Sequence, residues 1–146
     1  MHLSIRIFVV LTLLATLAPL QGSFRPSDLD DGLRIEPSHT RVGLARVYLE
    51  VSDLAMRGDR LTGRYRIRVP LLPSKNDVGS IQLTPPREAG GAIGLLVGHA
   101  HSDDGGVRRD VSCEILDEET LRIDIFTDDR VLTFQTHYAR IAVGRS

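Results

Sequence analysis

The sequence predicts an all-β protein: an antiparallel β-sandwich or a small, incompletely closed β-barrel of about 6–7 strands, preceded by a signal peptide. Segments that alternate apolar and polar residues recur along the chain, which is the period of a half-buried strand. Turn-forming residues separate these segments at a spacing of roughly 8–14 residues, and no convincing helical periodicity follows the signal peptide. Because the strands differ in length and the middle loops are long, we favour a sandwich or an incompletely closed barrel over a fully closed barrel.

The first segment of the chain has the three-part layout of a secretory signal peptide. A short start with one positive charge precedes an apolar run from Ile7 to Leu17, and small and turn-forming residues follow. The run is shorter than the ~20 residues that a comfortable transmembrane helix needs, although an uncleaved signal anchor is the alternative. We therefore expect a signal peptide (1–22), an irregular N-terminal tether (23–41), a single antiparallel β-domain (42–143) and a frayed C-terminus (144–146).

The clearest strand pattern is a hairpin over residues 46–69, whose two arms both alternate apolar and polar residues. A two-residue loop at Gly58-Asp59 would set Val51 opposite Arg66, so that the apolar face of one arm would meet the basic face of the other. We therefore predict a three-residue loop or a β-bulge near Ser52, which would pair Val51 with Ile67.

Two shorter strands follow the hairpin. Pro70 and Pro73 end it, and a dense run of turn-forming residues over 74–79 leads into a strand over 80–84. Residues 92–100 are apolar on both alternating faces, which predicts a strand covered on both sides or one whose small face lies close to another element. A short helix is the alternative, although Gly94 and Gly98 argue against it.

The lengths of the last two turns predict that the last three strands form a meander. A three-residue loop at 117–119 pairs Cys113 with Ile123, and a two-residue loop at 128–129 pairs Ile123 with Phe134. The apolar faces agree in both pairs, so Cys113 is expected to be a buried, inert thiol.

Composition argues against several classes of function. The net charge is −1 and tryptophan is absent, so we expect no binding of nucleic acid, and the platforms on which lectins stack sugars are scarce. A single cysteine leaves no internal disulfide, which fits a bacterial envelope better than a disulfide-rich eukaryotic secretion. No nucleophile elbow, phosphate-binding glycine loop or zinc-type cysteine pair is present, and no motif is specific enough to name a family.

The first candidate site is a ladder of arginines at alternate positions of the second hairpin arm, namely Arg64, Arg66 and Arg68. Such a ladder could bind an anionic lipid or glycan. The alternative is a solvated outer face that Glu50, expected opposite Arg68, partly neutralises.

The second candidate site is a metal site formed by His99, His101 and Asp103. Residues two apart on a strand project to the same side, so both imidazoles could bind one ion, and a turn carboxylate could complete the site. His137 or His39 could add a ligand. The alternative is a strand end that runs into a solvated Asp-Gly turn.

We therefore interpret the chain as an exported, non-catalytic β-domain that acts as a binding or scaffolding module of the cell envelope, secreted or periplasmic. The expected partner is an envelope protein or an anionic lipid or glycan, with no cofactor. Two alternatives stay open: a carrier of a small apolar or lipid-like ligand in the domain interior, and a metal-binding protein or metalloenzyme that uses the two histidines. The sequence does not define the oligomeric state.

Overall fold

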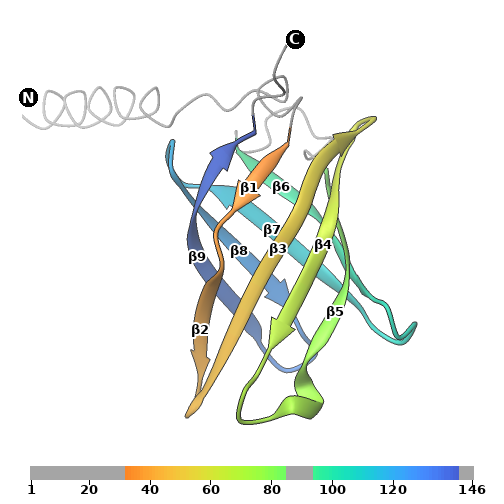
Figure 1. Cartoon of the computed structure of the whole chain (residues 1–146), viewed down its shortest axis with the longest axis vertical. Coiled ribbons are helices and arrows are strands. Elements are labelled where there is room, and N and C mark those ends of the chain that lie inside the picture. The colour runs from red at the N-terminus through yellow and green to blue at the C-terminus, as the bar shows by residue number, and fades with distance from the viewer. Residues whose placement is uncertain (1–31, 85–93, 142–146) are drawn as a thin grey trace, which may run out of the picture.

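The computed structural model describes residues 32–84 and 94–141, which form an antiparallel β-barrel (Figure 1). Its strands are β1 (Leu33–Ile35), β2 (Ser38–Val42), β3 (Ala45–Arg57), β4 (Arg60–Arg68), β5 (Asp77–Thr84), β6 (Leu95–Ser102), β7 (Arg108–Ile115), β8 (Thr120–Phe126) and β9 (Val131–Arg140). One short 3-10 turn, η3 (Pro73–Lys75), lies between β4 and β5. The predicted signal peptide and frayed C-terminus lie outside the described residues.

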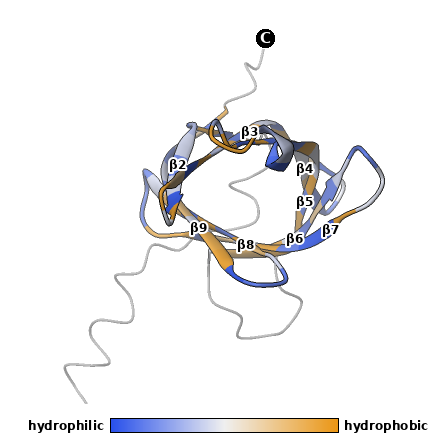
Figure 2. Ribbon diagram, turned by 90° about the horizontal axis from the view of Figure 1, so that it is seen from below, coloured by the Kyte–Doolittle hydropathy of each residue, from blue (hydrophilic) through white to orange (hydrophobic). Residues whose placement is uncertain are grey.

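The barrel is closed by β1, which pairs with strands on both of its sides. Leu33 pairs with Arg140 of β9 and also with Leu54 of β3, so β1 and β3–β9 form a closed ring of eight strands. Figure 2 shows this ring from below. The extra strand, β2, pairs with β3 from Ser38 to Val42. Pro37 separates β1 from β2, and proline cannot donate to a ladder.

This closure corrects two of our expectations. The all-β, antiparallel architecture is confirmed, but the fold is a closed barrel rather than a sandwich or an incompletely closed barrel, and it has more strands than predicted. The expected irregular tether over 23–41 is wrong for residues 33–35 and 38–41, which belong to β1 and β2. Both strands are so short that their alternating pattern is weak.

The β3–β4 hairpin contains the predicted bulge. Arg57 pairs with Arg60 across a two-residue turn, and the register shifts between Ser52 and Ala55. The extra residue lies in β3, so Val51 faces Tyr65 rather than the predicted Ile67. Asp53 adopts a positive φ of 56° within this bulge, a conformation that Asp tolerates better than most residues. The bulge thereby turns the side chain of Leu54 inward, where β1 pairs with β3.

The predicted meander of β7, β8 and β9 is confirmed. Cys113 pairs with Ile123, and Ile123 pairs with Phe134, as the turn lengths required. All three side chains are buried in the barrel.

The interior of the barrel is filled by large apolar side chains. Buried residues from all eight strands of the ring form one cluster, which includes Leu33, Leu54, Leu61, Ile81, Leu83, Leu96, Val111, Leu121, Ile125 and Phe134. An eight-stranded barrel is just wide enough for its own side chains to fill. The inward positions therefore provide the hydrophobic core, and the outward positions are mostly polar.

Two glycines allow adjacent strands to approach closely at β5 and β6. A Cβ added to Gly98 would lie 1.7 Å from the carbonyl oxygen of Gln82. A Cβ added to Gly79 would lie 2.8 Å from the ring of Tyr65, its cross-strand partner. Gly79 therefore makes room for the tyrosine ring to lie across the inside of β5.

Candidate functional site

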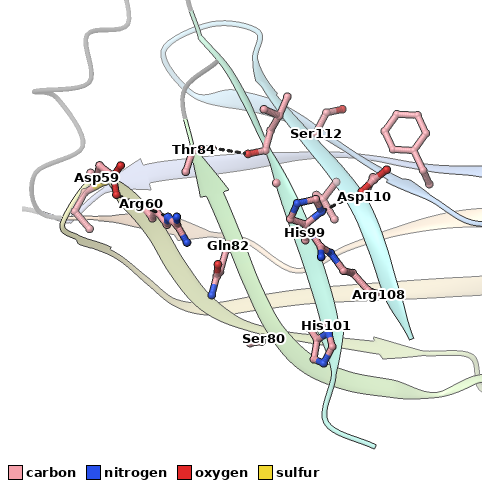
Figure 3. A pocket seen from close by; sticks show the side chains of 15 residues that line it. Asp59, Arg60, Ser80, Gln82, Thr84, His99, His101, Arg108, Asp110 and Ser112 are labelled. Carbon is pink, nitrogen blue, oxygen red and sulfur yellow. Dashed lines mark hydrogen bonds and ion pairs between the residues drawn. The ribbon is translucent and has the colours of Figure 1, made fainter. Parts of the chain in front are cut away.

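A broad, open depression lies on the outer face of β5, β6 and β7 (Figure 3). Its volume is about 1400 Å³, and Asp59 and Arg60 of the β3–β4 turn contribute to one side of it. The strands contribute Ser80, Gln82, Thr84, His99, His101, Arg108, Asp110 and Ser112. These are the outward side chains of neighbouring strands, and the depression presents their hydrogen-bonding groups beside the exposed apolar side chains of Val97 and Phe126.

The two histidines of the predicted metal site lie side by side on this outer face. His99 pairs across the sheet with Gln82 on one side and with Asp110 on the other. Its Nδ1 lies 3.0 Å from Oδ1 of Asp110. His101 lies in the next row, opposite Arg108 of β7. Both histidines are exposed, so they are available to a ligand from solvent.

Asp103, the third predicted ligand, is engaged by an arginine. Both carboxylate oxygens of Asp103 accept hydrogen bonds from the guanidinium of Arg64, which comes from β4. This hydrogen bond is the main reason that the pKa of Asp103 lies below its ordinary value, and the charge of His101 lowers it further. The same bond raises the pKa of Arg64.

In the described ranges, 32–84 and 94–141, no group of three or more His, Cys, Asp or Glu side chains is placed so that it could hold a metal ion. Metal binding by His99, His101 and Asp103 stays a prediction.

The arginine ladder lies on the outer face of β4, as predicted, and each member has a neighbour. Arg64 binds Asp103, and Arg66 lies 4.0 Å from the carboxylate of Glu50. Glu50 pairs with Arg66 rather than with the predicted Arg68. The extra residue of the bulge moves the pairing by one residue from that of a plain two-residue turn, in the direction opposite to the one that we predicted. The guanidinium of Arg68 instead lies 5.2 Å from the ring centre of Tyr48. The ladder is therefore partly neutralised, although all three side chains are exposed.

A polar cluster inside the barrel was not predicted. The carboxylate of Asp77 accepts hydrogen bonds from Tyr65 Oη at 2.7 Å, Ser102 Oγ at 2.5 Å and Arg109 Nη1 at 2.7 Å. The side chains of Asp77 and Arg109 are 14% and 25% exposed, so this ion pair is largely withdrawn from water. The cluster joins β4, β5, β6 and β7 near the end of the barrel that holds η3.

The pKa values of this cluster follow from burial and from the three hydrogen bonds. Burial raises the pKa of Asp77, but the bonds from Ser102, Tyr65 and Arg109 together outweigh it, and the net shift is downward. Burial and the bond to Asp77 raise the pKa of Tyr65. Asp77 is therefore a satisfied carboxylate held ionised between strands, an arrangement that stabilises the barrel end.

The sequence did contain a signal for this cluster. Asp77 shares its alternating face with Gly79, Ile81 and Leu83, all of which point inward. Residues 74–79 are rich in turn-forming residues, so we predicted a turn there. We therefore did not expect Asp77 to lie in a strand with its side chain pointing inward.

Cys113 is fully buried, and burial raises its pKa to about 12. A buried neutral thiol is a poor nucleophile.

Comparison with family models, curated proteins and solved structures finds no match to this chain. Within the described residues, none of the helical segments has the length and apolar character needed to cross a membrane.

Proposed function

We propose that this protein is an exported, non-catalytic binding module of the cell envelope, located outside the cytoplasm, and that it binds an acidic glycan in the depression on β5–β7. The observation that carries this proposal is the contrast between the two faces of the sheet. The inward face is filled by apolar side chains, while the outward face gathers hydrogen-bonding groups from three adjacent strands.

Acidic glycans fit this depression because its donors are arranged in rows. Ser80, His101 and Arg108 are direct cross-strand neighbours, which sets a hydroxyl, an imidazole and a guanidinium beside one another. Among the described residues, Arg108 has no ion-pair partner, so its guanidinium is available to a carboxylate. Gln82, His99 and Asp110 form the next row, in which the carboxylate of Asp110 is paired with Nδ1 of His99, and this row can bind sugar hydroxyls.

The carrier alternative gains no support from the interior. The aromatic side chains that could line an interior ligand cavity, namely Tyr65, Phe134 and Tyr138, are themselves buried in the packed core. We therefore place the ligand on the outside of the barrel.

The test is binding of a uronic acid polymer and of neutral dextran, measured by calorimetry at moderate salt. A His101→Ala/Arg108→Ala variant should bind the acidic polymer at least tenfold more weakly, because charge-assisted hydrogen bonds contribute about 1.5–3 kcal/mol each. The matched control is His39→Ala/Arg41→Ala, which removes the same two side-chain types from β2. The proposal would be refuted if dextran bound as tightly as the acidic polymer, or if the two double variants lost the same amount of affinity for that polymer.

A further inference from the structure

The end of the barrel that carries the β2–β3 and β4–β5 loops exposes an unusual number of apolar side chains. Because neighbouring strands are antiparallel, the β2–β3, β4–β5, β6–β7 and β8–β9 connections all lie at this end, at the bottom of Figure 1. Seven of the ten exposed large apolar residues in the described ranges are in or next to these connections: Leu44, Leu71, Leu72, Val78, Val107, Phe126 and Val131. A contiguous exposed apolar patch marks a contact with another surface, and neighbouring loop tips at this end are where such a patch can form.

The most exposed of these side chains lie at the tips of two neighbouring loops. Leu44 is 97% exposed at the β2–β3 turn, a position where turn chemistry favours Asn, Asp or Gly. Leu71 and Leu72 are 69% and 50% exposed in the β4–β5 loop. Tyr48 pairs with Arg68, and each loop begins a few residues beyond that pair, so the two tips project side by side.

The backbone of the β4–β5 loop is fixed by two prolines and by hydrogen bonds at its base. Its leucines stand between Pro70 and Pro73, and the backbone N–H of Leu72 donates to the carbonyl of Val69 at 3.0 Å. The side chain of Asn76 accepts a hydrogen bond from the N–H of Val69 at 2.7 Å. The exposed leucines are therefore preorganised, which lowers the entropy lost when they enter another phase.

Basic side chains surround the two tips, and acidic ones are absent from both segments. Residues 38–48 and 66–76 contain Arg41, Arg46, Arg66, Arg68 and Lys75 and no Asp or Glu. Arg41 and Arg46 are directly opposite each other on β2 and β3, and within the described part of the chain neither has an ion-pair partner. Like charges directly opposite each other destabilise a sheet, so this pair points to a negatively charged partner.

We propose that this end of the barrel docks onto an anionic phospholipid bilayer. Leu44, Leu71 and Leu72 would enter the boundary between headgroups and acyl chains, while Arg41 and Arg46 would bind lipid phosphates. Two copies of the chain would bring like charges together if their basic halves faced each other, and a dimer in another orientation is an outcome of the test below. The acidic β6–β7 and β8–β9 turns, with Asp103, Asp104, Asp128 and Asp129, confine the contact to one half of the end.

The experiment is sedimentation of the purified protein with vesicles of phosphatidylglycerol and phosphatidylcholine, compared with vesicles of phosphatidylcholine alone. We expect binding to the anionic vesicles that weakens with added salt. A Leu44→Ser/Leu71→Ser variant should bind at least tenfold more weakly. Leu116→Ser/Ile141→Ser is the matched control, because both residues are exposed apolar side chains away from these loops.

The charge contribution is tested separately. Arg41→Gln/Arg46→Gln should weaken binding about 25-fold, at about fivefold for each arginine, whereas Arg57→Gln/Arg60→Gln at the opposite end should leave binding unchanged. Equal binding to both vesicle types, equal binding by the loop variants and their controls, or a dimer that dissociates in the Leu44→Ser/Leu71→Ser variant would overturn the proposal. The glycan-site variant His101→Ala/Arg108→Ala should still bind vesicles, so this inference and the proposed function fail or succeed independently.

Discussion

Replacing Asp77 with asparagine should destabilise the barrel more than any exposed charge substitution on its surface. The amide keeps the shape of the carboxylate but removes its charge, and its NH2 group turns a donor toward the donors of Tyr65, Ser102 and Arg109. Breaking one partner of a largely buried ion pair costs several kcal/mol. Because Arg109 retains some contact with water, we expect a loss of about 2–4 kcal/mol, which is a large part of the roughly 5–15 kcal/mol that holds a domain together.

Urea denaturation followed by circular dichroism at pH 7 measures this loss. The control is Asp103→Asn, which breaks the exposed pair with Arg64 and should shift the urea midpoint much less. Tyr65→Phe removes a single donor from the cluster and should cost about 1 kcal/mol, so the reasoning stays testable if the asparagine variant does not fold. If Asp77→Asn is no less stable than Asp103→Asn, the cluster does not stabilise the fold in the way described.

The same cluster makes a prediction about acid. The pKa of Asp77 is lower in the folded barrel than its ordinary value of 3.8, so the unfolded chain takes up the proton first as the pH falls. Its contribution to stability is complete above pH 3.8 and is lost progressively below it. The asparagine variant should therefore lose less stability between pH 5 and pH 2 than the wild-type protein does.

Two further predictions concern the packed interior. Gly98→Ala should destabilise the barrel by several kcal/mol in thermal melting, because its Cβ would meet the carbonyl of Gln82. Gly106→Ala, which has no such contact, should melt within about 0.5 kcal/mol of the wild type. Burial raises the pKa of Cys113 to about 12 and also raises that of Tyr65, so both groups hold their protons more tightly when folded. Stability should therefore be complete below their ordinary values of 9.0 and 10.0 and fall as the pH rises past them, and a flat urea midpoint between pH 8 and pH 11 would contradict this.

The sequence predicted those parts of the fold in which a short turn fixes the register. Strands β7, β8 and β9 are joined by short loops, and matching the apolar faces of Cys113, Ile123 and Phe134 across them left one pairing. The bulge in β3 followed from the same argument. Its direction did not, because Val51 meets an apolar partner whether it faces Tyr65 or Ile67.

The closure of the barrel could not be predicted in this way. It depends on Leu33 meeting both Arg140 and Leu54, and no turn sets the register between strands so distant in sequence. In addition, β1 is 3 residues long, which is too short for periodicity to be significant. Closure is a property of the whole sheet, set by its twist and by the number of strands.

The candidate site was predicted in part for the same physical reason. Alternation placed His99 and His101 on one outward face, and the structure confirms that placement. Their partners Gln82 and Asp110 come from other strands, and cross-strand neighbours depend on a register that the sequence did not define for β5 and β6.

The filled interior determines where binding can occur on this protein. A barrel whose inward positions are occupied by its own side chains has its outer wall and its two ends available for ligands. The glycan depression proposed here is on the wall, and the proposed lipid-binding loops are at one end, so the two surfaces face in different directions. An end docked on a bilayer would leave the wall exposed to glycans beside the membrane. The Asp77 cluster joins four strands near that same end, and it stabilises the base from which the β4–β5 loop projects.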